Sequence, residues 1–225
     1  MAHDADPKVI AELVPQVPTI GCSGTFLCTM SDDSDNDDRL KPRTAQEAAQ
    51  RVVAILALIG KAHDPERSAA WRQKHGVDQL LSRAEEAFIK DPAPAEMARI
   101  AFSWRAEAMV SLIWALGGIA EMPSFDRQFN LFDVEMVRAA LKDPHQFIAD
   151  AQLRSDDEIS TMEHFLYHQH WRVRDAQLGG HGQYEPNPGD PPIEELHPGI
   201  VQERRYGMSW LVGWGRDWDS VPLDT

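Results

Sequence analysis

The sequence predicts an all-α protein: a compact multi-helix bundle with an irregular N-terminal arm and a long Pro/Gly-rich loop before the last helix. Three observations predict it. Apolar residues recur at helical spacing from residue 44 onward. Ser or Thr stands three residues before Glu at three points, as in capping boxes. Beyond short runs, no segment alternates apolar and polar residues as a half-buried strand does. We therefore expect an acidic, partly flexible arm over residues 1–43 and one helical domain over residues 44–225.

Composition limits the possible classes of protein. A chain of 225 residues with 43% hydrophobic residues buries enough surface to fold without disulfide bonds. The 36 acidic residues outnumber the 22 basic ones, for a net charge of -14. The Lys and Arg residues form no continuous basic stripe. Nucleic acid and anionic membranes are therefore not expected partners. No segment reaches the roughly 18 apolar residues that span a bilayer. We expect a cytoplasmic protein in which Cys22 and Cys28 are free thiols.

The arm contains an acidic run over residues 31–38, with five Asp and no apolar residue. Such a run buries too little surface to offset the entropy of ordering it. A calcium-binding EF-hand loop counted from Asp32 would need Gly at its sixth position and Glu at its twelfth. Asp37 and Arg43 stand there instead, so we expect a solvated acidic loop.

The first helices follow from local signals. Thr44 and Glu47 form a capping box, and the helix behind them closes at Gly60 and the Asp64-Pro65 pair. Asp64 then caps a second helix, which ends at Gly76, and Ser82 opens a short third one through Ile89. The clearest helical pattern runs from about Pro94 to Gly117. It is apolar around most of its circumference near residues 110–116, which predicts a central, buried position.

The second half contains shorter elements and one long connection. Asp133 is expected to cap a short helix through Leu141, and another short turn holds Phe147 and Ile148. Ser155 and Glu158 open a helix that ends at Gly179-Gly180. Residues 179–199 contain five Pro and five Gly, which predicts a loop long enough to be functional. A last helix is expected from about Pro198 to Trp214.

Two charged residues stand on apolar helix faces. Glu107 follows Trp104 by three residues and precedes Trp114 by seven, and Arg204 has the same relation to Val201 and Leu211. A buried charge needs a partner, so we expect Glu107 and Arg204 to meet inside the bundle, with Arg105 or Glu203 at the margin. The pair is either a structural contact that fixes helix register or a carboxylate–guanidinium pocket for a small ligand.

Three histidines share one predicted helix. His170 lies on the apolar face, between Leu166 and Val173, where it is either a hydrogen-bonded core residue or a general acid–base group. His164 and His168 are four residues apart, a spacing that suits a metal ion. Their helix lacks the Glu of a His-Glu-x-x-His motif, so the alternative is a partly exposed polar face. No phosphate-binding or dinucleotide-binding motif occurs, and we expect no cofactor.

Four patches of residues resemble the bacterial domain-of-unknown-function family DUF4272, over roughly residues 40 to 225. They are Arg43 to Arg51; Leu81 to Phe88; Arg105 to Ala108 with Trp114 to Gly117; and His170, Trp171 and Arg174 together with Glu203 to Tyr206, Trp210-Leu211, Trp218-Asp219 and Asp224-Thr225. The resemblance implies an all-helical domain and brings no established reaction. With the two inward charges it gives our candidate polar network: Arg105, Glu107, His170, Arg174, Glu203, Arg204, Trp218 and Asp219.

Two functions fit this sequence. The first is a binding or protein-interaction module with a buried Glu/Arg/His network, which engages a protein partner or a second copy of itself. The second is a small-molecule hydrolase, with or without a metal ion, whose pocket lies near Glu107, His170 and Arg204. In that second interpretation the loop over residues 179–199 acts as a lid. We expect the first, because no residue pattern specifies a reaction.

Overall fold

The computed structural model describes residues 41–180 and 184–223, all within the unit that begins at Arg39. The predicted arm, with Cys22, Cys28 and the acidic run, lies outside the described residues except for positions 41–43. The domain boundary expected at residue 43 therefore stays a prediction.

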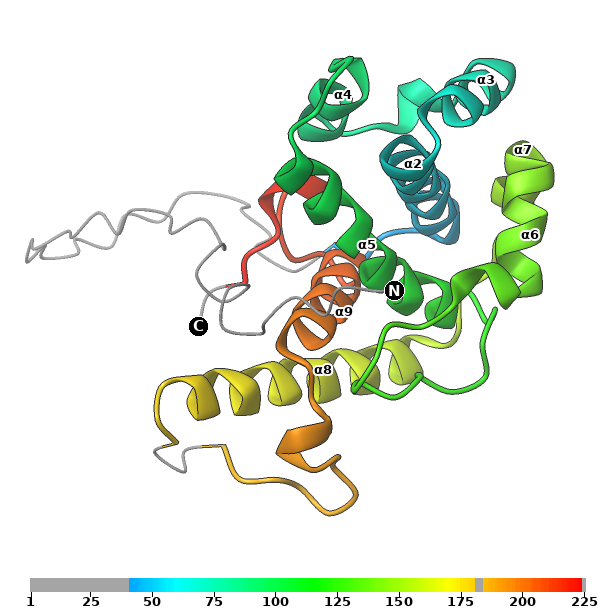
Figure 1. Cartoon of the computed structure of the whole chain (residues 1–225). Coiled ribbons are helices and arrows are strands. Elements are labelled where there is room, and N and C mark those ends of the chain that lie inside the picture. The colour runs from blue at the N-terminus through cyan, green and yellow to red at the C-terminus, as the bar shows by residue number, and fades with distance from the viewer. Residues whose placement is uncertain (1–40, 181–183, 224–225) are drawn as a thin grey trace, which may run out of the picture. The chain divides into compact units, whose positions relative to one another are not determined.

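The described residues form helices and no strands, which confirms the all-α fold (Figure 1). None of these helices is both apolar and long enough to cross a bilayer. The helices are α2 (Ala45–His63), α3 (Pro65–His75), α4 (Arg83–Lys90), α5 (Glu96–Ala115), α6 (Glu135–Lys142), α7 (Pro144–Ala149), α8 (Asp156–Gln177) and α9 (Pro198–Leu211), with 3-10 turns η1 (Val77–Leu80), η2 (Leu131–Asp133), η3 (Ile193–Glu195) and η4 (Trp218–Ser220).

Most helix starts are where local signals place them. All three predicted capping boxes are present, at the starts of α2, α4 and α8. The Asp64 side chain accepts the backbone N–H of Arg67 at the start of α3, and Gly76 ends that helix in the left-handed conformation, with φ 62°. Each terminus thus satisfies backbone groups that a bare helix end leaves unpaired.

The predicted cap at Asp133 is wrong. Asp133 ends η2, and the Asn130 side-chain amide donates to its carboxylate at 2.6 Å. The helix α6 begins two residues later, behind Val134, without a side-chain cap. The last helix is also shorter than expected, because α9 ends at Leu211 rather than near Trp214.

The core lies where α9 packs between α5 and α8, and α2 packs along α5 (Figure 1). Its fully buried side chains include Ile55, Met109, Leu166 and Met208, one from each of these helices. Helices α5 and α9 approach so closely at Gly207 that a Cβ there would lie 2.4 Å from the Ala108 carbonyl oxygen. A side chain of any size at position 207 would push the two central helices apart.

Asp190 holds the connection between α8 and α9. Its carboxylate accepts the Gln169 side-chain amide and the Asn187 backbone N–H, each at 2.8 Å. It also lies 3.2 Å from Nε2 of His168. Residues 184–197 of this predicted loop are therefore tied to the buried face of α8.

Candidate functional site

Glu107 of α5 and Arg204 of α9 meet inside the bundle, as their helical spacing predicted. Nε and Nη2 of Arg204 each lie 2.9 Å from Oε2 of Glu107. The arginine is fully buried, and the glutamate is 1% exposed. Burial lowers the pKa of Arg204, and the Glu107 carboxylate opposes that shift. The two helices thus share one desolvated ion pair.

The remaining polar atoms of this pair hold the segment that follows α5. Nη1 of Arg204 donates to the carbonyls of Pro123 at 2.6 Å and Ser124 at 3.0 Å. Oε1 of Glu107 accepts the backbone N–H of Phe129 at 3.0 Å. Both carboxylate oxygens are therefore engaged, and the pair fixes the path of residues 123–129 across the end of α9.

Residues 128–132, which begin at the end of that segment, form one wall of a groove of about 500 Å³. Its other walls are the C-terminal end of α2, with Ile59 and Ala62, and the exposed half of α5. The apolar side chains at its rim are large and open to solvent: Ile100 is 43% exposed and Phe132 is 51% exposed. Its polar lining includes His63, Glu96, Arg99 and Asn130. We call this the α2–α5 groove, and Glu107 is one of the residues that line it.

A second group of predicted residues lies at the other side of α5. Arg105 pairs with Glu203 at 3.0 Å, and its guanidinium lies 4.0 Å from the centre of the Tyr206 ring. Burial raises the pKa of Glu203, whereas Arg105 limits the rise. Burial likewise raises the pKa of Tyr206 to about 12, and the Tyr206 hydroxyl donates to the Trp218 carbonyl. This cluster anchors the C-terminal turn η4 rather than lining the groove.

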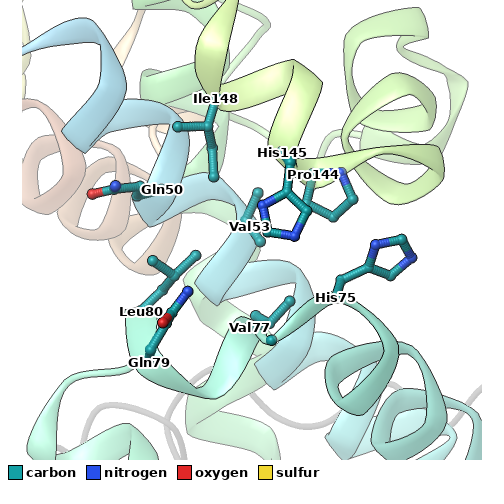
Figure 2. A pocket seen from close by; sticks show the side chains of 10 residues that line it. Gln50, Val53, His75, Val77, Gln79, Leu80, Pro144, His145 and Ile148 are labelled. Atoms are coloured by element: carbon teal, nitrogen blue, oxygen red, sulfur yellow. The ribbon is translucent and has the colours of Figure 1, made fainter.

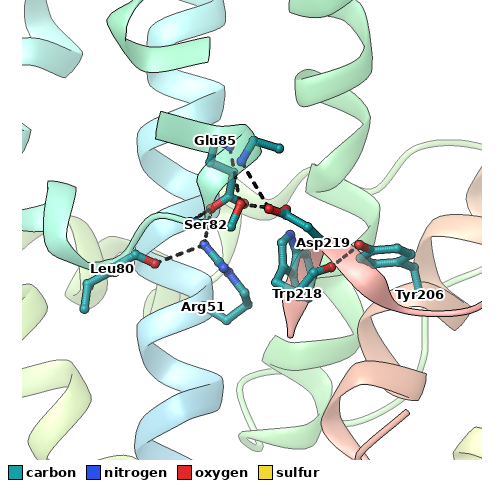
Figure 3. Close-up of polar contacts among 8 residues, drawn as sticks. Arg51, Leu80, Ser82, Glu85, Tyr206, Trp218 and Asp219 are labelled. Carbon is teal, nitrogen blue, oxygen red and sulfur yellow. Dashed lines mark hydrogen bonds and ion pairs between the residues drawn. The ribbon is translucent and has the colours of Figure 1, made fainter. Parts of the chain in front are cut away.

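The same cluster contains an ion pair that sequence reasoning missed (Figure 3). Nη2 of Arg51 lies 2.6 Å from Oε2 of Glu85, and both side chains are buried. The Arg51 guanidinium also lies 4.8 Å from the centre of the Trp218 ring. Asp219 then accepts the Ser82 hydroxyl at 2.7 Å and the Ala84 N–H at 3.1 Å. Arg51 stands three residues after Ala48 and four before Ile55, so the criterion that identified Glu107 also applied to it.

The third group, His170 and Arg174, lies at the contact of α8 with α9. Burial, with the cationic Arg205 and Arg174, lowers the pKa of His170 to about 3. The neighbouring residues Arg204 and Arg205 point to different faces of α9, the first to Glu107 and the second toward α8. In the part of the chain that the structure describes, the predicted residues thus fall into three groups of contacts, one around Glu107 and Arg204, one around Arg105 and Glu203, and one around His170.

The two other histidines of α8 do not gather ligands around them. Nε2 of His168 faces Asp190, and within residues 41–180 and 184–223 no three His, Cys, Asp or Glu side chains cluster as a metal site requires. His164 is exposed and His168 is half-buried, which is what the alternative of a partly exposed polar face predicts.

The model of a protein family described as "Domain of unknown function (DUF4272)" matches residues 33–221 of the chain. The chain belongs to the DUF4272 family. No curated protein and no solved structure matches it. The matched range runs from before α2 to the end of η4. The DUF4272 domain therefore includes the α2–α5 groove and all three polar groups.

Proposed function

We propose that this DUF4272 protein is a cytoplasmic interaction module that binds an apolar segment of a basic protein partner in the α2–α5 groove. The observation that carries the proposal is the groove itself, with Ile100 and Phe132 open to solvent at its rim. Large exposed apolar side chains that cluster around a hollow are typical of interaction sites.

The dimensions of the groove fit a peptide segment. Its volume of about 500 Å³ is in the range of ligand-binding clefts. Trp104 and Leu131 add apolar lining behind the rim. An amphipathic helix binds such a groove through apolar residues spaced three and four apart. Polar groups at the margin, among them Glu96 and Arg99, would fix the register of that helix.

Charge supports a basic partner. The net charge of -14 creates a field that attracts cationic proteins and speeds their association. That field also disfavours a second copy of the same acidic chain. A partner with Lys or Arg beside its apolar residues would match the apolar groove and the negative net charge of the chain.

The saturated polar groups support binding over catalysis. A general acid or base needs a free lone pair or proton within reach of the substrate. Both oxygens of Glu107 are occupied, by Arg204 and by the Phe129 N–H. His170 belongs to α8 and does not line the groove.

A random peptide library displayed on phage tests the proposal, because such a selection does not require the partner to be identified. We expect selected peptides to share apolar residues at helical spacing flanked by Lys or Arg. Phe132→Glu should weaken binding of the synthesised peptides at least about tenfold, because it places a charge at an apolar hot spot. Leu178→Glu is the control, since Leu178 is 67% exposed at the end of α8. Absence of enrichment, or equal binding to Phe132→Glu, would contradict the proposal.

A further inference from the structure

A smaller pocket of about 140 Å³ is lined by residues of α2, α3, η1 and α7 (Figure 2). No Lys, Arg, Asp or Glu side chain lines it, and part of its wall is formed by apolar side chains such as Val53. Its polar side chains are the imidazoles of His75 and His145 and the amides of Gln50 and Gln79. None of these four residues belongs to the three polar groups or lines the α2–α5 groove.

Four separate elements position these polar groups around the pocket. His75 is the last residue of α3, and the left-handed Gly76 then turns the chain into η1, which carries Gln79. His145 lies in the first turn of α7, and Gln50 belongs to α2. Figure 2 shows the two imidazoles on one side of the pocket and the two amides on the other. The pocket therefore offers hydrogen-bonding groups to a ligand from two sides.

The two glutamine amides are available to such a ligand. Within residues 41–180 and 184–223, neither amide has a hydrogen-bond partner in the protein. The buried Gln169, in contrast, donates to Asp190 and accepts from Arg172. A glutamine amide offers both N–H donors and a carbonyl acceptor, and a neutral imidazole adds one donor and one acceptor. The lining thus matches a ligand that carries donors and acceptors but no charge.

The volume of the pocket limits the size of the ligand. A protein cavity of about 150 Å³ accommodates benzene, so a pocket of about 140 Å³ takes one six-membered ring. An anion would meet no Lys or Arg in the lining and would approach a chain of net charge -14. We propose that the pocket binds a neutral single-ring nitrogen heterocycle with both N–H and C=O groups, the class that includes the pyrimidine bases. The apolar wall covers a face of the ring, and the glutamine amides bind its polar edge.

Nuclear magnetic resonance titration of the full chain, labelled with nitrogen-15, tests the site with uracil as the probe. We expect saturable shifts of the Gln50 and Gln79 side-chain amide signals. Gln50→Leu and Gln79→Leu nearly keep the side-chain volume but remove the hydrogen-bonding groups, so each should weaken uracil binding about fivefold or more. Gln73→Leu is the matched control, because Gln73 is exposed on α3 and does not line the pocket. It should bind uracil as the wild type does.

Two further probes test the class of ligand. Benzene lacks the polar edge, and orotate adds a carboxylate to the uracil ring, so both should bind more weakly than uracil. Phe132→Glu should bind uracil normally, which separates this pocket from the α2–α5 groove. Circular dichroism of each variant checks that the fold persists. No saturable shift in the wild type, unchanged affinity in both pocket variants, or orotate bound as tightly as uracil would overturn the proposal.

Discussion

Among single residues, two buried arginines, Arg51 and Arg204, have more than one partner each. Arg204 binds Glu107 and also two backbone carbonyls, of Pro123 and Ser124. Arg51 binds Glu85 while the same carboxylate oxygen caps α4 through the Ser82 N–H. A buried charge costs several kcal/mol in lost hydration, which only multiple contacts repay. These pairs therefore fix the position of backbone segments as well as of each other.

Removing only Glu107 or only Arg204 should destabilise the fold more than the ion pair as a whole stabilises it. We expect Glu107→Met and Arg204→Met each to lower the free energy of unfolding by about 3–5 kcal/mol, because each leaves a buried charge or a buried amide without its partner. The double variant should be less destabilised than the sum of the two by at least about 1 kcal/mol. Urea unfolding of the four proteins measures this coupling, and additive single effects would contradict it.

His170 should make stability depend on pH. Its pKa in the folded protein is about 3, against about 6.5 in an unfolded chain. The unfolded state therefore binds the proton first, so the contribution of His170 is complete above about pH 6.5 and declines as the pH falls toward the folded value. The slope reaches about 1.4 kcal/mol per pH unit.

His170→Gln removes that titration while it keeps a polar side chain of similar size. We expect its unfolding free energy to fall less steeply than that of the wild type between about pH 6.5 and pH 4. Chemical denaturation at several pH values compares the two curves. Parallel curves would show that His170 takes up its proton in the folded state as easily as in the unfolded one.

Among elements, the contact of α5 with α9 sets the geometry of the molecule. Gly207 lies against the Ala108 carbonyl, and Ser111 of α5 donates to the Arg204 carbonyl of α9 at 2.7 Å. Both contacts require the helix axes to lie close together. The separation of these helices in turn determines whether Glu107 reaches Arg204.

The variant Gly207→Ala tests whether α5 and α9 have to lie this close together. Alanine favours a helix over glycine by about 1 kcal/mol, so propensity alone predicts a gain in stability. The Cβ would lie 2.4 Å from the Ala108 oxygen, and we expect a net loss of about 1–3 kcal/mol from overpacking. Gln202→Ala, on the same helix, should stay within about 0.5 kcal/mol of the wild type. Thermal unfolding compares the three proteins, and a stabilised Gly207→Ala would mean that the helices separate without cost.

Helix starts were predictable because each depends on residues close in the chain. The capping boxes at Thr44, Ser82 and Ser155 need only a hydroxyl and a glutamate three residues later. The prediction at Asp133 failed because Asn130, three residues earlier, engages the same carboxylate. A local pattern thus specifies a helix start unless another nearby side chain binds the capping group first, as Asn130 does with Asp133.

At the scale of the whole molecule, helical spacing predicted that Glu107 and Arg204 face inward. It did not predict which backbone groups they bind. Their partners Pro123 and Phe129 lie in a segment without helical pattern. The α2–α5 groove combines surfaces more than 60 residues apart in the chain, such as those of Ile59 and Phe132. Such sites depend on tertiary packing, which single-sequence periodicity does not encode.

The central claim is that the buried pair holds the wall of the groove. The double variant Glu107→Met/Arg204→Met removes the carboxylate that accepts the Phe129 N–H without leaving an unpaired charge. Amide hydrogen exchange at Phe129 is the most direct test. We predict at least about tenfold faster exchange there, with the buried amides of Val110 to Ala115 in α5 still protected. Unchanged exchange at Phe129 would contradict the claim, because the segment would then be held by other contacts.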